Sequence, residues 1–187
     1  MRLIVALTGA SGVIYGKRLL EVLHKKNVET HLVISKAAEK VIEHELETSK
    51  ESLEKLAAHS YDINDLSAPI VSGSYNTDAM VVIPCSMKTL AGITQGYSDN
   101  LILRAADVTL KEGRKLILVP RETPLNAIHL RNMLDLAGLG VMIVPAMPAY
   151  YHKPKNIRGL TDYVVGKTLD CIGMDHSLFE RWTTSSV

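Results

Sequence analysis

The segment that decides the fold is Arg2-Leu3-Ile4-Val5-Ala6-Leu7-Thr8-Gly9-Ala10-Ser11-Gly12, an apolar run that leads directly into a glycine-containing turn. A helical pattern from Val13 to about Lys26 follows it. Glycines let the backbone turn sharply and approach an anion closely, and the free N–H groups at the start of the next helix attract that anion. The layout therefore predicts a phosphate-binding turn, and close packing of the helix on the strand is the simpler structural alternative.

The spacing of the glycines distinguishes between classes of nucleotide. Gly9, Gly12 and Gly16 give the pattern G-x-x-G-x-x-x-G, which differs from the G-x-G-x-x-G fingerprint of dinucleotide-binding proteins. The second apolar run, between Glu29 and Ser35, also lacks the closing acidic residue that binds a ribose of NAD. We therefore expect a mononucleotide such as FMN rather than NAD.

Length and composition limit the classes of protein to which the chain can belong. Its 187 residues with 47% hydrophobic content suit one domain, which we place at residues 1–182, followed by a tail at residues 183–187. The formal net charge of +1 provides no overall field for nucleic acid or an anionic membrane, so we expect neither as a partner. Two cysteines, no leader-like segment and no membrane-length apolar run favour a cytoplasmic protein.

Strand-like and helix-like segments alternate along the chain. Five apolar runs predict strands buried on both faces, at Leu3–Leu7, Thr30–Ile34, Met80–Pro84, Leu116–Val119 and Val141–Val144. Helical patterns lie at Val13–Lys26, Lys36–Glu47, Glu51–Ala58, Asp99–Glu112, Pro124–Ala137 and Ile157–Ile172. This order predicts a doubly wound α/β fold of Rossmann type, with a parallel sheet and right-handed crossovers.

Polar or conformationally special residues follow each predicted strand, and in a parallel sheet such residues meet at one edge, where ligands bind. Taken singly, Ser35 and Ser86 have a structural explanation as helix N-caps. Arg121 and Glu122 have one as a surface ion pair. Together, hydroxyl, ammonium and guanidinium groups suit a phosphate and a polar ring, so the set predicts a ligand site. The set comprises Gly9–Ser11, Ser35, Pro84–Thr89, Pro120–Pro124 and Pro145–Pro154.

Several segments carry a more specific pattern, namely Gly9–Gly12, Ser35–Ala38, Pro84–Leu90, Arg104–Val108, Leu110–Glu112, Pro120–Leu125 and Pro148–His152. They resemble the UbiX/Pad1 family of flavin prenyltransferases, from the first strand to about Trp182. The resemblance implies a flavodoxin-like fold and metal-independent transfer of a dimethylallyl group from dimethylallyl phosphate to N5 and C6 of reduced FMN. It also implies a dodecamer built from trimers, and a UbiD-type decarboxylase that receives the prenylated FMN.

The same resemblance implies roles for individual residues. Catalytic roles fall to Glu122, Glu45 and Ser11. The prenyl phosphate is expected to contact Tyr151 and Lys167, with Arg104 or Lys111 adding positive charge from the same or a neighbouring subunit. From the helical pattern alone, Glu45 is a solvent-facing residue. The residues expected to bind FMN are Gly9, Ala10, Ser11, Ser35, Ser86, Met87, Lys88, Thr89 and Arg121.

Two other functions remain open from the sequence. An FMN-dependent cysteine decarboxylase of the phosphopantothenoylcysteine type shares the expected fold, but calls for a Pro-Ala-Ser-Ala-Asn-Thr-like loop where this chain has Pro84-Cys85-Ser86-Met87-Lys88-Thr89. A non-catalytic FMN carrier or chaperone is the second alternative. The sequence also leaves open whether the prenyl donor is a monophosphate or a diphosphate.

Some residues with reactive side chains have a simpler interpretation. We expect Cys85 to be a small buried side chain rather than a nucleophile. The seven histidines show no metal-ligand spacing, so no metal site is expected. Leu66 occupies a position where some family members have an aromatic residue. We therefore expect the side chains that line the prenyl pocket to differ here from those of such members.

Overall fold

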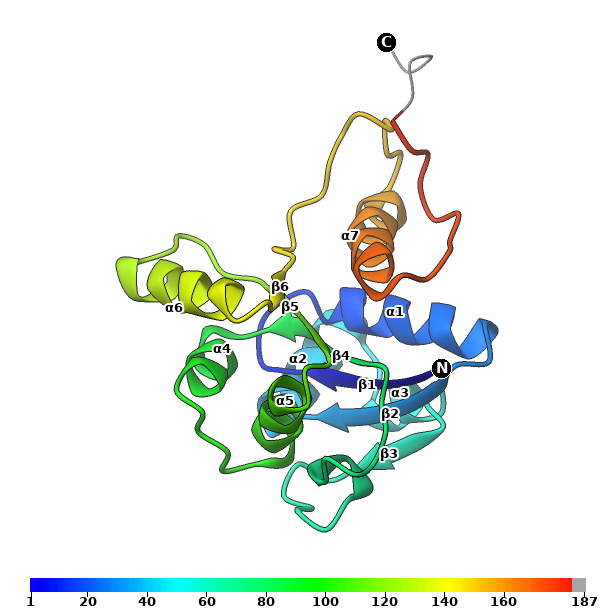
Figure 1. Ribbon diagram of the computed structural model, residues 1–187. Coiled ribbons are helices and arrows are strands. Elements are labelled where there is room, and N and C mark those ends of the chain that lie inside the picture. The colour runs from blue at the N-terminus through cyan, green and yellow to red at the C-terminus, as the bar shows by residue number, and fades with distance from the viewer. Residues whose placement is uncertain (183–187) are drawn as a thin grey trace.

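A computed structural model describes residues 1–182, so the tail expected at residues 183–187 lies outside the described part (Figure 1). Its centre is a six-stranded sheet in the order β3-β2-β1-β4-β5-β6, in which every neighbouring pair is parallel. The strands are β1 (Arg2–Leu7), β2 (Glu29–Ile34), β3 (His59–Tyr61), β4 (Ala79–Cys85), β5 (Lys115–Pro120) and β6 (Met142–Ile143). The helices are α1 (Val13–Lys25), α2 (Lys36–Leu46), α3 (Lys50–Glu54), α4 (Met87–Thr94), α5 (Leu101–Lys111), α6 (Ala127–Gly138) and α7 (Ile157–Ile172), with a 3-10 turn η1 (Pro69–Val71).

The helices form two layers, each with its own hydrophobic core against one face of the sheet. Side chains of α1, α2, α3 and α7 pack with one set of strand residues, whereas those of η1, α4, α5 and α6 pack with the alternate set. Strand residues alternate between the two cores because successive side chains of a strand point to opposite faces, as Leu3 and Ile4 illustrate. This arrangement confirms the predicted doubly wound, flavodoxin-like, single-domain fold.

Three elements, β3, α4 and the 3-10 turn η1, were not predicted, and three helices differ in extent by two or more residues. The pairing of β3 with β2 was missed because its first two residues, His59 and Ser60, are exposed and form no apolar run. Helix α4 is short and contains Gly92, which weakens a helical pattern. The helix expected at Glu51–Ala58 ends at Glu54, and those expected from Asp99 and Pro124 begin two and three residues later, after the N-caps Asn100 and Asn126.

The order of the strands reverses at β1, which pairs with β2 on one side and with β4 on the other. Chain segments that leave β1 and β4 therefore separate at this point, which is where doubly wound sheets bind ligands. Thr8, directly after β1, joins the two strand ends because its Oγ1 donates to the carbonyl of Pro84 at 2.8 Å and accepts from the N–H of Ser86 at 2.7 Å. This buried side chain gives the site a rigid base.

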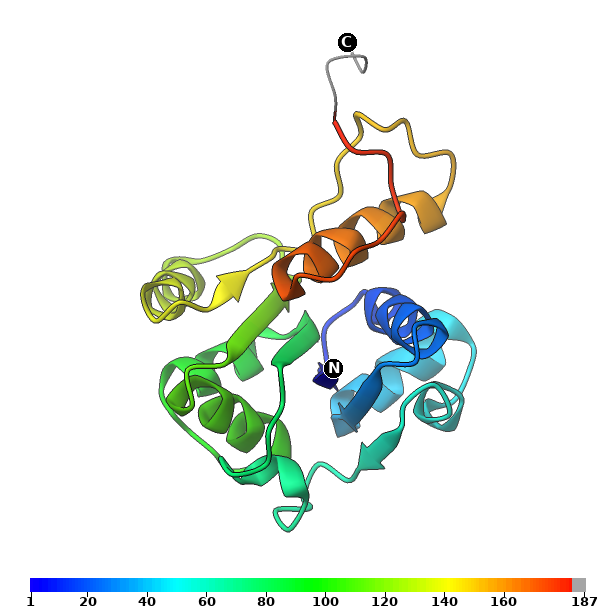
Figure 2. The same ribbon diagram turned by 45° about the vertical axis from the view of Figure 1, so that its right-hand side comes forward.

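Helix α7 packs beside α1 and β5 on one face of the sheet, and α6 packs beside α4 and β6 on the other (Figures 1 and 2). The loop of residues 144–156 connects β6 to α7, and the chain after α7 runs back beside that helix toward the loop (Figures 1 and 2). In residues 1–182 the helices are all too short or too polar to span a bilayer.

Candidate active site

The starts of three helices surround one cavity at the carboxyl edge of the sheet. The N-caps Ser35, Ser86 and Asn100 of α2, α4 and α5 all line this space of about 480 Å3, which we call the cap cavity. Lys36 and Lys88 also line it. Three helix N-termini and two ammonium groups outnumber the one carboxylate in the lining, that of Asp99, so the cavity fits the phosphate of a mononucleotide.

Each helix begins at the cap cavity because a side chain satisfies one of its free N–H groups. Ser35 Oγ accepts from the N–H of Ala38 at 3.1 Å, and Asn100 Oδ1 accepts from the N–H of Leu103 at 3.1 Å. Ser86 Oγ accepts from the N–H of Thr89 at 3.3 Å and donates to its hydroxyl at 3.1 Å. The structural explanation of Ser35 and Ser86 as N-caps is thus confirmed, and it coexists with their place in the cavity.

The glycine-containing turn after β1 contributes to the cap cavity and also contacts α2. Gly9 lines the cap cavity, and a Cβ at this position would lie 2.4 Å from the Cβ of Ala37, so a side chain does not fit. Gly12 has a φ of 97°, in the left-handed region that favours glycine. However, the N–H groups of Gly12 and Val13 donate to Glu45 Oε2 at 2.8 and 3.2 Å. The N–H groups at the start of α1 therefore bind a carboxylate of this chain, whereas Gly9 of the same turn lines the cap cavity.

Glu45 thus does more than face solvent, which is all that the helical pattern indicated. Glu45 is an exposed residue of α2, yet its carboxylate accepts a hydrogen bond from the start of α1. Ser11, the neighbouring catalytic candidate, uses its carbonyl to accept from Arg121 Nε at 3.2 Å. These contacts join the loop after β1 to the last turn of α2 and to the loop after β5.

A second cavity of about 270 Å3 lies between the loops after β5 and β6, and we call it the Glu122 cavity. Arg121 and Glu122 line one side of it, and Pro145 and Met147 line another. Glu122 Oε1 accepts from the N–H of Thr123 at 3.0 Å, which fixes the exposed carboxylate beside the cavity. The structure therefore brings Arg121 and Glu122 to one space as predicted, although the two side chains do not form the surface ion pair that was the alternative.

A third cavity of about 300 Å3, the Lys167 cavity, shares Pro145 and Met147 with the second. Lys167 enters it from α7 beside Tyr163. Tyr151 lies edge-on to Tyr163, with ring centroids 6.0 Å apart. The two residues expected to contact the prenyl phosphate are therefore connected through Tyr163, next to the Glu122 cavity.

Several predicted site residues lie elsewhere within one subunit. Arg104 pairs with Asp107 on α5 at 2.6 Å, and Lys111 pairs with Glu112 near Gly73, toward the opposite edge of the sheet. Neither residue lines any of the three cavities, so within one subunit the structure does not bring them to Tyr151 and Lys167. Two residues expected to bind FMN are also packed against the protein: Ala10 is buried and Met87 packs against the core beneath α4, and their contacts to FMN stay a prediction.

Burial affects two titratable groups near the site. Cys85 is fully buried, and this burial raises the pKa of its thiol to about 12, so the thiol stays protonated at neutral pH. The prediction that Cys85 is a buried side chain rather than a nucleophile is thus confirmed. Burial also raises the pKa of Tyr15, and the nearby positive charge of Arg121 acts in the opposite direction.

The sequence interpretation missed Lys36 and Asn100 as part of the site. Lys36 follows Ser35 directly, so its position at a helix start was a usable signal. A second usable signal was that Asn100 precedes an apolar helical pattern, because asparagine is a favoured N-cap. That the start of α5 reaches the same cavity depends on how α5 packs, which no local pattern shows.

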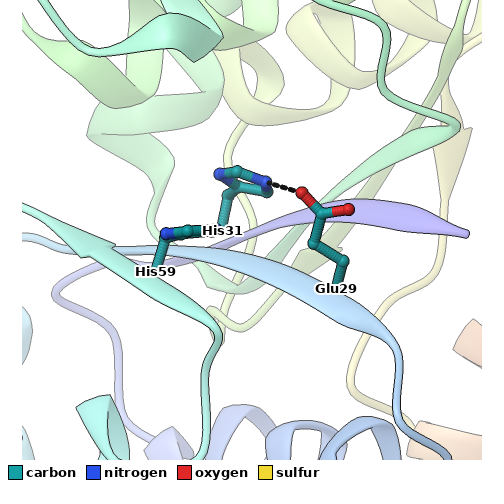
Figure 3. Close-up of side chains that lie close together, drawn as sticks. All are labelled: Glu29, His31 and His59. Carbon is teal, nitrogen blue, oxygen red and sulfur yellow. Dashed lines mark hydrogen bonds and ion pairs between the residues drawn. The ribbon is translucent and has the colours of Figure 1, made fainter.

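One further cluster of titratable side chains lies toward the amino-terminal ends of strands β2 and β3, which we call the amino-terminal half of the sheet, away from the three cavities (Figure 3). Glu29, His31 and His59 place possible ligand atoms within 4.8 Å of one another, which the spacing of histidines in the sequence did not indicate. His31 already bonds Tyr61 Oη at 2.8 Å through Nδ1 and Glu29 Oε1 at 3.2 Å through Nε2, and its ring stacks on His59. Arg2 Nε also donates to Glu29 Oε1 at 2.7 Å. Stacked rings and an occupied carboxylate suit a hydrogen-bonded network better than a metal ion.

Comparison with known proteins shows the family. A sequence profile described as Flavoprotein matches residues 1–169. Flavin prenyltransferase UbiX of Methanocaldococcus jannaschii is 54% identical over 184 residues, which cover 98% of this chain and 100% of that protein. The chain belongs to the UbiX/Pad1 family of flavin prenyltransferases. Another relative, the mitochondrial flavin prenyltransferase PAD1 of Saccharomyces cerevisiae, is 50% identical over 97% of this chain and 75% of its own length.

Solved structures of UbiX proteins share the fold over nearly the whole chain. A dodecameric FMN-dependent UbiX-like decarboxylase from Escherichia coli has a TM-score of 0.96 and 53% identity, and the match covers 98% of this chain and 100% of that one. AnUbiX (PadA1), solved with FMN and dimethylallyl pyrophosphate, has a TM-score of 0.96 and 50% identity over 97% of each chain. The peptidyl-cysteine decarboxylase EpiD, at a TM-score of 0.60 and 19% identity, shows a shared fold alone.

Proposed function

We infer that this member of the UbiX/Pad1 family transfers a dimethylallyl group from dimethylallyl phosphate to N5 and C6 of reduced FMN. The observation that carries this inference is the convergence of three capped helix starts and two lysines on the cap cavity, beside the Glu122 and Lys167 cavities. The first space suits the phosphate of FMN, and the other two suit a second, smaller phosphorylated substrate. The relative AnUbiX, whose structure contains FMN and a dimethylallyl diphosphate, supports this pairing.

FMN binding falls to residues of the cap cavity and the adjoining loops. Ser86, Lys88 and Thr89 supply two hydroxyl groups and an ammonium group at the start of α4. Arg121, fixed by the carbonyl of Ser11, supplies a guanidinium group at the next strand end. When bound, reduced FMN supplies the nucleophilic ring atoms.

Donor binding falls to Tyr151 and Lys167. Allylic C–O cleavage leaves a delocalised cation and a phosphate, so the enzyme must stabilise departing negative charge with hydrogen-bond donors such as these. Water must be excluded, because it would trap the cation as an alcohol, and the apolar side chains of Pro145, Met147 and Tyr163 provide such a wall. Arg104 or Lys111 of a neighbouring subunit adds positive charge.

Ring closure onto C6 requires a proton delivered to the remaining prenyl double bond and a proton removed from C6, and Glu122 is the favoured acceptor of the proton that leaves C6. Within residues 1–182 each carboxylate bonds through one oxygen, but Glu45 Oε2 accepts two N–H groups, whereas Glu122 Oε1 accepts only the N–H of Thr123. Glu122 also lines a cavity, which places its carboxylate beside a bound substrate.

Assembly into a homo-oligomer, such as the dodecamer of the Escherichia coli relative, fits the surface of the chain. Helix α6 exposes Ile128, Leu130 and Leu134, with the exposed fraction of Leu134 at 71%. Met147 and Tyr150, at 67% and 70%, extend this apolar surface to the loop after β6. Apolar side chains concentrated at α6 and the loop after β6 favour an interface between subunits. The product is then passed to a UbiD-type decarboxylase.

We place the reaction in the cytoplasm. Cys85 and Cys171 are both free thiols in the structure, which suits a reducing compartment. Cell fractionation with an antibody to the chain tests this placement.

Mass analysis of flavin tests the proposed reaction directly. Purified protein is incubated without oxygen with reduced FMN and either dimethylallyl phosphate or dimethylallyl diphosphate. The flavin is then extracted and its molecular mass is measured by mass spectrometry. We expect FMN that has gained one five-carbon group. Protein that retains FMN but never modifies it with either donor would favour the carrier alternative, and release of carbon dioxide from a cysteine-containing substrate would favour the decarboxylase.

A further inference from the structure

Asp170, near the end of α7, is the meeting point of three side chains. Its Oδ1 accepts from Arg181 Nη2 at 2.6 Å and from His176 Nε2 at 3.1 Å, and its Oδ2 accepts from Arg181 Nη1 at 3.2 Å. The same Oδ2 lies 3.4 Å from Nζ of Lys167, one helical turn earlier. One carboxylate therefore contacts both the cation of the Lys167 cavity and the chain that follows α7.

The chain of residues 173–182, which we call the C-terminal strap, returns beside α7 (Figures 1 and 2). Phe179 of the strap packs on Tyr163 with ring centroids 4.9 Å apart, and Gly166 leaves room for it, because a Cβ there would lie 2.5 Å from the Phe179 ring. At the end of the strap, Trp182 meets Tyr151 edge to face, with centroids 5.4 Å apart. The strap therefore reaches both aromatic residues that border the donor site.

Asp170 pairs with two cations, and the carboxylate of Asp175 also acts on one of them, Arg181. Arg181 holds the pKa of Asp170 below its usual value, so this carboxylate is ionised at neutral pH. It carries one negative charge against two positive charges on Lys167 and Arg181. Lys167 uses one of its three N–H donors for Asp170 within residues 1–182, which leaves two for an anionic ligand such as a phosphate ester.

We propose that Asp170 is a positioning residue for the prenyl donor: it orients the ammonium of Lys167 and fastens the C-terminal strap through Arg181. The fastened strap keeps Trp182 against Tyr151 and shields the donor from water. This proposal rests on the proposed function, because it assigns Tyr151 and the Lys167 cavity to the donor. FMN binding in the cap cavity is independent of Asp170, so the two substrates should respond differently to its loss.

Asp170→Asn tests the proposal, with Asp175→Asn as the matched control. Asp175 is an exposed strap residue that makes no hydrogen bond or ion pair within residues 1–182. Trp182 is the sole tryptophan of the chain, so its fluorescence reports the end of the strap. In Asp170→Asn we expect red-shifted emission, stronger quenching by acrylamide and a KM for dimethylallyl phosphate raised about tenfold. The Kd for FMN and the kcat should stay within about twofold of the parent values. Asp175→Asn should behave as the parent in every measurement.

Arg181→Gln is a second variant, which keeps the experiment decisive if Asp170→Asn folds poorly. It should reproduce the fluorescence change, and combining it with Asp170→Asn should add little further change, because both remove the same contact. Unchanged fluorescence in both single variants overturns the fastening of the strap. Changed fluorescence with an unchanged KM overturns the role in donor binding. If the parent protein itself never prenylates FMN, the proposed function fails and the donor role fails with it, whereas the fluorescence still decides whether Asp170 fastens the strap.

Discussion

The carboxyl edge of the sheet and its amino-terminal half both carry charged and polar side chains. The two regions differ in whether these side chains form hydrogen bonds and ion pairs with one another. At the carboxyl edge, Lys36 and Lys88 line the cap cavity and form no ion pair within residues 1–182. In the amino-terminal half, Glu29 accepts from both Arg2 and His31 (Figure 3). Polar groups that bond one another stabilise the fold, whereas those left with free bonding capacity around a cavity are available to a ligand.

The same substitution at the two ends of the sheet should have opposite results. Glu122→Gln removes a carboxylate beside the Glu122 cavity and should slow prenyl transfer by about a hundredfold, with FMN affinity unchanged. Glu29→Gln should leave the transfer rate unchanged and lower the stability of the fold, because it weakens the contacts to Arg2 and His31. Single-turnover kinetics and urea unfolding of both variants make the comparison. An equal loss of rate in the two would contradict the division between a reacting end and a stabilising end.

Two lysines that each pair with a carboxylate sharpen the comparison. Lys167→Ala should raise the KM for dimethylallyl phosphate about tenfold while FMN stays bound, because Lys167 lies in the third cavity and not in the cap cavity. Lys50, which pairs with Glu39 at 2.8 Å outside the three cavities, is the control. Steady-state kinetics of Lys50→Ala should match the parent. Loss of FMN from Lys167→Ala would show that the donor and FMN sites are not separate.

Loss of a helix N-cap should separate ligand binding from stability. Ser86→Ala and Asn156→Ala each remove a cap, so each should lower the free energy of unfolding by about 1 kcal/mol. Only Ser86 lines the cap cavity, so only Ser86→Ala should also weaken FMN binding, by about tenfold. Fluorescence titration with FMN measures this difference. Similar FMN affinities of the two variants would remove Ser86 from the binding site.

Acid should weaken the amino-terminal half of the sheet first. Burial lowers the pKa of His31 below its usual value of 6.5. As the pH drops below 6.5, the unfolded chain takes up a proton at this histidine that the native ring resists, so the stability of the fold decreases. Arg2 and His31 lower the pKa of Glu29 from 4.5 to about 2, so the stability from this carboxylate is present above pH 4.5 and is lost as the pH falls toward 2. Urea midpoints between pH 7 and pH 3 should fall less steeply for Glu29→Gln below pH 4.5. Parallel curves for parent and variant would contradict this assignment.

The fold was largely predictable because its central strands are long apolar runs. Segments such as Leu3–Leu7 are buried on both faces, and this burial leaves a local signal. The strand β3 left no such signal, since it is three residues long and its stability comes from pairing with β2. Elements whose formation depends on a neighbour are the ones that a local pattern misses.

The site was predictable only in part, for the same reason. Ser86, Lys88 and Arg121 follow predicted strands, and the parallel sheet brings such residues to one edge. The bonds of Glu45 to the start of α1 join two helices, and those of Asp170 join α7 to the strap. Contacts of this kind depend on how the helices pack, so the sequence named Glu45 only through the family resemblance.

Hydrogen–deuterium exchange with and without FMN tests the central claim most directly, namely that the cap cavity binds FMN and that the amino-terminal half of the sheet binds nothing in this reaction. The account predicts slower amide exchange on adding FMN at the starts of α2, α4 and α5, near Ser35, Ser86 and Asn100. It predicts no change around the cluster of Glu29, His31 and His59. Protection confined to the start of α1 or to that cluster, with the three capped helix starts unaffected, would contradict it.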